Sequence, residues 1–200
     1  EQRAGELELI NGIQQAMADS LDFQAIVDLV GDKLREVLHT DTLGIRWYDG
    51  EARRVSFLYE VERGQRIHPA PREIVPGGPV EQLNRARQAT LYPTRAAMRA
   101  AGLLRVGAEE CLCAMRVPIV RGERMVAFIS LENYEREHAY GQAELRLVST
   151  IAASMGVAMD NARLFKETQE ALQQQTATAE VLQVISSSIA DAQPVLNKIL

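Results

Sequence analysis

The sequence of 200 residues contains no apolar stretch long enough to cross a membrane. Its longest apolar segment, residues 145–159, is interrupted by Arg146 and Ser149, whereas a membrane-spanning helix needs about 20 predominantly apolar residues. No segment has the pattern of a secretory signal peptide. The chain begins at Glu1 without a methionine and stops at Leu200 within an apolar-periodic segment, so we expect a cytoplasmic part of a longer polypeptide.

Basic clusters and common catalytic motifs are also missing. The net charge is -5, the pI is about 5.3, and the 22 lysines and arginines are scattered, which excludes nucleic acid as an expected partner. The sequence has none of the usual motifs for phosphate-binding loops, zinc proteases, serine hydrolases or dinucleotide binding. Its three histidines lack metal-ligand spacing. We therefore expect neither an enzyme nor a metal protein.

Cysteine is scarce, with only Cys111 and Cys113 in the chain. On a strand their Cα atoms would lie about 6.6 Å apart on one face, at the far edge of disulfide reach. Reduced, buried and inert thiols are the expectation, because free cysteine packs as a small hydrophobic residue.

The apolar periodicity predicts an alternation of helices and hairpins. Helical spacing covers residues 8–20 and 22–38, with Asp22 placed to cap the second helix. Alternating patterns predict two β-hairpins, over residues 43–61 and 111–133. The irregular middle holds further short elements, and these are a helix at 80–87, a strand at 90–92 and a helix at 94–101. A long helix starts near Gln142, so the fold class is α+β, with one antiparallel sheet that has helices on both faces.

Two segments of the sequence are similar to a known domain family. These are CAMRVPIVRGERMVAFISLEN, residues 113–133, and EREHAYGQAELRLVSTIAASMGVAMDNARLF, residues 135–165. Both resemble the GAF domain family, and the resemblance covers residues 7–165. It implies a small-molecule-sensing and dimerising module, here a regulatory sensor of a bacterial signalling protein such as a two-component system. The expected output is a histidine kinase or a nucleotide cyclase.

An internal sequence repeat predicts more than one such domain. The string EVLQVIS at 180–186 is similar to ELINGIQ at 8–14, and ADAQPVLNKI at 190–199 is similar to LDFQAIVDLV at 21–30. We therefore divide the chain into an incoming linker with the first helix, a GAF domain, a coiled-coil-like signalling helix and the start of a second GAF domain. These cover residues 1–20, 21–165, 166–189 and 190–200, respectively.

A ligand site is expected between the sheet and the irregular middle, because the resemblance places the family's pocket there. Arg46 and Arg116 lie among apolar neighbours in strands, where an unpaired cation would cost several kcal/mol. Each needs a partner, which is Glu60, Glu132, solvent or a bound anion. A glycine turn before residue 80 either caps the following helix or offers its N–H groups to an anion. The candidate ligand-binding residues are Arg46, Arg116, Gly77, Gly78 and Tyr92, and the expected ligand is a small anion.

No cofactor is assigned, because no bilin, haem or metal signature is present. The family's cyclic-nucleotide signature is missing, and so is the Cys-His dipeptide common in bilin-binding members. A ligandless dimerisation and relay module is the alternative function. A redox enzyme of the free methionine sulfoxide reductase type, which the resemblance also allows, is a distant third.

The long helix carries a heptad-like apolar seam. Its members for the expected dimer and signalling contact are Val148, Ile151, Met155, Ala158, Ala162, Phe165 and Leu172. The seam predicts a parallel homodimer. The alternative is that residues 148–165 pack on the sheet and the rest is a solvated linker.

Overall fold

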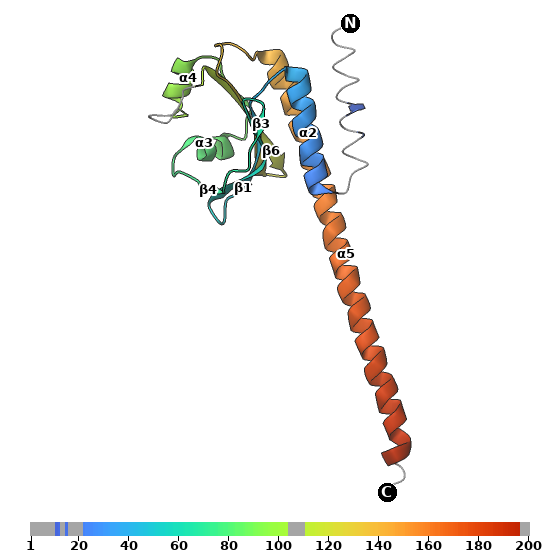
Figure 1. Cartoon of the computed structure of the whole chain (residues 1–200). Helices are drawn as coiled ribbons and strands as arrows, with labels where there is room; N and C mark the ends of the chain where they lie inside the picture. Colours follow the sequence, from blue (N-terminus) through green and yellow to red (C-terminus); the bar gives the residue numbers. More distant parts are fainter. Residues whose placement is uncertain (1–10, 13–14, 16–21, 104–110, 197–200) are drawn as a thin grey trace. The chain divides into compact units, whose positions relative to one another are not determined.

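A computed structural model of the chain describes residues 11–12, 15, 22–103 and 111–196 (Figure 1). The chain divides into two units, Glu1–Asn161 and Ala162–Leu200, which are described separately below. The helix predicted over residues 8–20 and most of the predicted linker at 1–20 lie outside the described residues.

The first unit alternates helices and strands in the predicted order. Its elements are α2 (Phe23–Leu38), β1 (Leu43–Asp49), β2 (Arg54–Glu62), β3 (Gln65–Arg66), β4 (Arg72–Glu73), α3 (Pro79–Ala86), β5 (Thr90–Tyr92), α4 (Arg95–Ala100), β6 (Cys113–Arg121), β7 (Arg124–Asn133) and the start of α5 (Gln142–Leu196). The side chain of Asp22 accepts from the N–H groups of Gln24 and Ala25, which confirms the predicted cap of α2.

The strands form one seven-stranded antiparallel sheet. Its order is β3-β2-β1-β7-β6-β5, with β4 also paired to β2. Figure 1 shows α2 and the first turns of α5 on one face of this sheet and α3 and α4 on the other. The predicted α+β class, with one antiparallel sheet and helices on both faces, is confirmed.

The face towards α2 and the start of α5 is almost wholly apolar. Cross-strand partners share a face, so Met115, Leu131, Leu43 and Val61 form one row across four strands, and all are buried. The helix α2 comes so close that a Cβ on Gly31 would lie 2.5 Å from the Tyr59 ring. Each apolar side chain removed from water here contributes about 1.5–3 kcal/mol, so this face forms the main core.

The helix α5 begins at Gln142 as predicted, and its first turns are part of the first unit. Gly156 packs directly on β6, because a Cβ there would stand 3.0 Å from the carbonyl oxygen of Val120. Arg121 and Asp160 add an ion pair of 3.0 Å between β6 and α5. The helix continues through Pro194 to Leu196, so residues 190–196, which we assigned to a second domain, are helical here.

The residues of the predicted dimer seam fall into a buried group and an exposed group. Val148, Ile151, Met155 and Ala158 are buried within the chain, at 0–8% exposure, so they are part of its own core. This burial is what the alternative of a helix packed on the sheet expects for these four residues, and the dimer seam stays a prediction. Ala162 is buried as well, whereas Phe165 and Leu172 are exposed.

Candidate ligand-binding site

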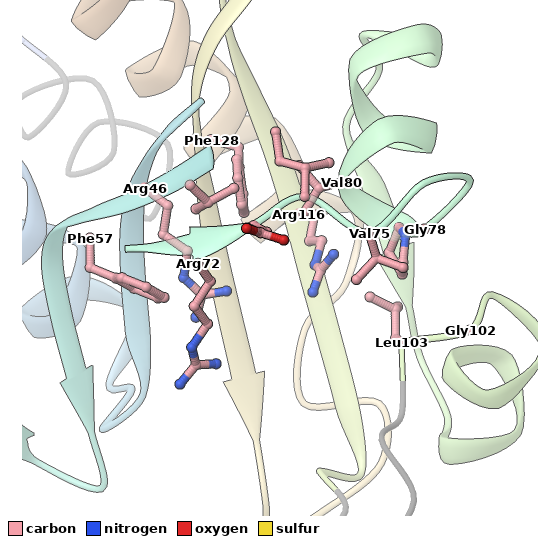
Figure 2. A pocket seen from close by; sticks show the side chains of 14 residues that line it. Arg46, Phe57, Arg72, Val75, Gly78, Val80, Gly102, Leu103, Arg116 and Phe128 are labelled. Carbon is pink, nitrogen blue, oxygen red and sulfur yellow. The ribbon is translucent and has the colours of Figure 1, made fainter. Parts of the chain in front are cut away.

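A cavity of about 360 Å³ lies on the other face of the sheet, below the start of α3 (Figure 2). This volume is at the lower end of the range for ligand pockets. The residues that line it are Arg46, Val55, Phe57, Arg72, Glu73, Ile74, Val75, Gly78, Pro79, Val80, Gly102, Leu103, Arg116 and Phe128.

The sheet register explains why charged residues reach this face. Arg116 on β6 lies opposite Ser130 on β7, which lies opposite Gly44 on β1, which in turn lies opposite Glu60 on β2. The next row runs from Pro118 through Phe128 and Arg46 to Phe57. Directly opposite residues share a face, so the two arginines and Glu60 project to the cavity side.

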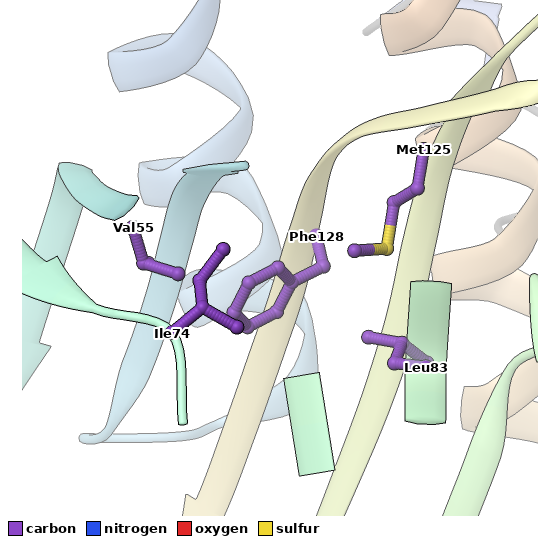
Figure 3. Packing of buried hydrophobic residues seen from close by; sticks show 5 residues of the cluster. All are labelled: Val55, Ile74, Leu83, Met125 and Phe128. Carbon is purple, nitrogen blue, oxygen red and sulfur yellow. The ribbon is translucent and has the colours of Figure 1, made fainter. Parts of the chain in front are cut away.

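An apolar cluster (Figure 3) shares Val55, Ile74 and Phe128 with the cavity wall. It consists of Val55, Ile74, Leu83, Met125 and Phe128, and the ring of Phe128 lies at its centre. Phe128 is fully buried. One end of the cavity wall is therefore a packed hydrophobic surface.

Arg46 is neutralised by Glu60. Its Nε donates to Oε2 at 3.0 Å, and its Nη2 donates to Oε1 at 2.5 Å. Burial by itself lowers the pKa of Arg46, but the hydrogen bonds and charge of Glu60 outweigh it, so this pKa is raised. The Arg46 guanidinium also lies 5.4 Å from the centre of the Phe57 ring. Of the partners left open for Arg46, the structure has Glu60.

Gly44 makes this ion pair possible. A Cβ at Gly44 would stand 2.4 Å from Glu60 Oε2 and 2.9 Å from Arg46 Nε. Any side chain at this position would displace the carboxylate or the guanidinium. Glycine is required here by the close approach of the pair rather than by its backbone angles.

Arg116 has no such partner among the described residues. Its Nε and Nη1 atoms are buried and make no hydrogen bond. Burial, followed by the charge of Arg46, lowers the pKa of Arg116 to about 10, against the opposing influence of Glu132. The hydroxyl of Ser130, its neighbour in the register, is also buried without a partner. Buried polar groups without partners are rare in proteins, and each needs an explanation such as strain or a bound ion or water.

The sequence analysis missed Arg72. This exposed residue on β4 has its guanidinium 5.3 Å from the centre of the Phe57 ring. In Figure 2 the Arg116 side chain extends towards Val75 and Leu103, with Arg46 and Arg72 on its other side. The strand β4 has only two residues, so no alternation could have predicted where Arg72 points.

Three of the five predicted ligand-binding residues line the cavity, and these are Arg46, Arg116 and Gly78. Gly77 is not among the lining residues, and its N–H donates to Glu81 at 2.8 Å. This hydrogen bond is the main cause of the lowered pKa of Glu81. The carboxylate of Glu81, in the first turn of α3, therefore already occupies the N-terminal end of this helix.

Tyr92 is not a lining residue either. It packs on a neighbouring cluster of Met98, Cys111 and Ala114.

Both cysteines are buried and free, as predicted. Cys111 Sγ lies 3.2 Å from Met98 Sδ. Burial raises the pKa of the Cys111 thiol to about 12, and the pKa of Cys113 is raised for the same reason. The thiolate is the nucleophilic form, so these thiols are unreactive at neutral pH.

Within the described residues, no three histidine, cysteine or acidic side chains come together in a way that could hold a metal ion. Across the same residues, no helix combines the length and apolarity that a bilayer crossing requires.

An antiparallel sheet with helices on both faces and a ligand-sized cavity under its short helices define an α+β module. The sequence model of the GAF domain family matches residues 20–160, and the chain belongs to this family. A comparison with curated proteins gave no match.

Solved structures share the fold at low sequence identity. The GAF domain from an Acinetobacter phosphoenolpyruvate-protein phosphotransferase has a TM-score of 0.66 and 13% identity, over 79% of this chain and 94% of that one. Residues 122 to 287 of a methyl-accepting chemotaxis protein have a TM-score of 0.66 and 16% identity, over 77% and 98%. A free methionine-R-sulfoxide reductase from Neisseria meningitidis, in complex with its substrate, has a TM-score of 0.65 and 13% identity, over 82% and 93%.

Proposed function

We propose that this GAF domain is the regulatory sensor module of a bacterial signalling protein and binds a small anionic molecule in the cavity. The observation that supports this is Arg116, whose buried Nε and Nη1 have no partner among the described residues. A buried cation without a partner is costly, and an anion beside it removes most of that cost. The domain performs no reaction in this proposal, since both thiols are buried and protonated at neutral pH.

The strand β6 is the proposed route from the cavity to the output. Arg116 and Val120 are on the same strand, and the carbonyl oxygen of Val120 faces Gly156 of α5. An anion that pulls on Arg116 would therefore bias the position of β6 under α5. A ligand changes such an equilibrium only by its differential affinity for the two positions. The output is a domain such as a histidine kinase or a nucleotide cyclase in the same cytoplasmic polypeptide.

A parallel homodimer completes the proposal. The second unit, from Ala162 onward, is a helix with large apolar side chains that are 42–62% exposed, and these are Leu164, Phe165, Leu172, Val181 and Leu182. A second copy of the same helix would cover them.

The test is a thermal-shift screen of small metabolite anions against three proteins. The wild type should be stabilised by at least one anion, and a ligand at 100 times its Kd adds about 2.7 kcal/mol. Arg116→Ala should lose this upshift. Arg124→Ala, which removes an exposed arginine away from the cavity, should keep it.

Absence of any stabilising anion would contradict the proposal if native mass spectrometry of protein purified from cells also finds no bound small molecule. The ligandless dimerisation and relay module would then be the function.

A further inference from the structure

Among the charged side chains that line the cavity, one cation has no ion-pair partner. These side chains are Arg46, Arg72, Glu73 and Arg116. Glu60 neutralises Arg46, and the exposed Arg72 and Glu73 have opposite signs. Arg116 makes no ion pair within 4.0 Å among the described residues, although the charge of Glu132, which accepts from Tyr134 at 2.9 Å, acts on it from a greater distance. A ligand with a single negative charge balances the lining residues, and the charge of Glu132 adds to the cost of a dianion.

The other lining residues offer no neutral polar side chain. Eight of them are apolar, two are glycines, and none has a hydroxyl, amide or imidazole group. A sugar or a nucleobase would bury several hydroxyl or amino groups here without side-chain partners. Each such group left unpaired costs about as much as a lost hydrogen bond, so polar ligands are disfavoured.

The unused hydrogen-bonding capacity of the cavity wall lies at Arg116. Its Nε and Nη1 atoms are buried without partners, and so is the hydroxyl of Ser130, which lies directly opposite on β7 but is not a lining residue. Val75, which is 62% exposed, and Leu103 lie beside Arg116, whereas Phe57 lies on the far side of Arg46 and Arg72 (Figure 2). A cation without a partner is therefore next to apolar surface.

We infer that the ligand is a monocarboxylate with an apolar, preferably aromatic, body. Its carboxylate lies against Arg116, whose planar guanidinium matches a carboxylate in shape and hydrogen-bonding directions. Its body lies against Val75 and Leu103, which are beside Arg116 in Figure 2. This inference rests on the proposed sensor function and narrows the ligand from any small anion to one chemical class.

Isothermal titration with a matched probe series tests it. The probes are 3-phenylpropanoate, its neutral amide 3-phenylpropanamide, propanoate without the ring, and the dianions succinate and phosphate. We expect saturable binding of 3-phenylpropanoate. The neutral amide should bind at least tenfold more weakly because it lacks the charge, and propanoate should bind at least tenfold more weakly because it lacks the apolar body.

The variant Arg116→Met gives a second measurement, which distinguishes a ligand-binding role of Arg116 from a purely structural one. It should weaken 3-phenylpropanoate binding roughly 30-fold or more, as loss of one member of a buried charge pair does. The same variant should raise the thermal midpoint of the ligand-free protein, because it replaces an unpaired buried cation by an apolar side chain of similar length. The control Arg124→Met should change neither value.

The outcomes separate this inference from the proposed function. Arg116-dependent binding of succinate or phosphate that is tighter than binding of 3-phenylpropanoate would overturn the carboxylate class and leave the sensor function in place. Equal binding of the amide and the acid would overturn the role of Arg116 as the carboxylate partner. A lower thermal midpoint in Arg116→Met would show that the arginine holds the fold together. Failure of every probe, with no co-purified small molecule, would contradict both the inference and the proposed function.

Discussion

Two arginines on neighbouring rows of one sheet face differ in whether their charge has an ion-pair partner. Arg46 is held by two hydrogen bonds to Glu60, and Arg116 has two buried nitrogens without partners. The difference comes from the register, which brings Glu60 next to Gly44 and Arg46 but places Ser130, a neutral residue, opposite Arg116. The charge of Arg46 is therefore balanced within the domain, whereas Arg116 is the residue on which the proposed anion site rests.

The Arg46–Glu60 pair gives the first prediction. Arg46→Met and Glu60→Gln should each lower the free energy of unfolding by about 3 kcal/mol, because either change leaves one charge of the buried pair without its partner or with a much weaker one. The double variant Arg46→Met/Glu60→Gln should recover most of the loss. Urea unfolding of the four proteins of this cycle measures the coupling. Losses below about 0.5 kcal/mol in both single variants, as for an exposed ion pair, would contradict it.

The second prediction concerns alkaline pH. The folded-state pKa of Cys111 is raised from 9.0 to about 12, so the stability linked to its protonated thiol is fully present below pH 9 and is lost as the pH rises towards 12. Tyr140, also raised to about 12, acts in the same direction. Arg116 acts in the opposite direction, because its depressed pKa means that a penalty present at neutral pH is relieved above pH 10.

Cys111→Ala should therefore show a shallower loss of unfolding free energy between pH 9 and 11 than the wild type. The difference should approach 1.4 kcal/mol per pH unit, the limit for one titrating group. Urea unfolding at several pH values measures it, and Met98→Leu, a change without a titratable group in the same cluster, is the control. Parallel pH profiles for Cys111→Ala and the wild type would show that the thiol is not the titrating group.

At the scale of elements, apolar periodicity predicted the helices and strands that bury an apolar face. The hairpin strands, β5 and the helices α2, α3 and α4 appear where the patterns place them, within one or two residues. The strands β3 and β4 were missed because both are two-residue, polar and exposed. Such strands exist through their pairing with β2, which is information that a local pattern does not contain.

The candidate site could be predicted only in part. A charge inside an apolar strand is visible in the sequence, so Arg46 and Arg116 were identified. Which of them is neutralised depends on the strand pairing that brings Glu60 opposite Gly44 and beside Arg46, and a local pattern does not contain this register. Arg72 depends on β4, whose pairing is not local.

The contact between α5 and β6 gives an element-scale prediction. Gly156→Val should lower the free energy of unfolding by about 1–3 kcal/mol, because its Cβ would be forced to 3.0 Å from the carbonyl oxygen of Val120. The neighbouring change Val157→Ala, at a 63% exposed position, should stay within about 0.5 kcal/mol. Urea unfolding compares the two. An unchanged Gly156→Val protein would mean that α5 shifts freely on β6, and the proposed relay would lose its contact.

At the scale of the whole molecule, the second unit needs an explanation for its exposed apolar residues. Phe165 and Leu172 are seven residues apart and lie on one helix face, as residues at the same position of successive heptads do in coiled coils. Pairs such as Lys166–Glu170, at 3.9 Å, add only a few tenths of a kcal/mol to an isolated helix. A lone helix in water gains little from propensity, so most of its stability has to come from packing.

The last prediction is a parallel dimer through residues 164–182. Leu172→Cys should form a disulfide between two chains under mild oxidation, because symmetry in a parallel pair places the two Leu172 positions opposite each other. Glu170→Cys, also exposed but on another side of the helix, should cross-link far less. The native cysteines will not compete, since both are buried. Leu172→Glu should shift the mass measured by sedimentation from dimer to monomer, because two like charges would meet in the seam.

A wild-type protein that stays monomeric at high concentration, or equal cross-linking of both cysteine variants, would exclude this seam. The helix beyond Ala162 would then be a solvated linker between neighbouring parts of the polypeptide.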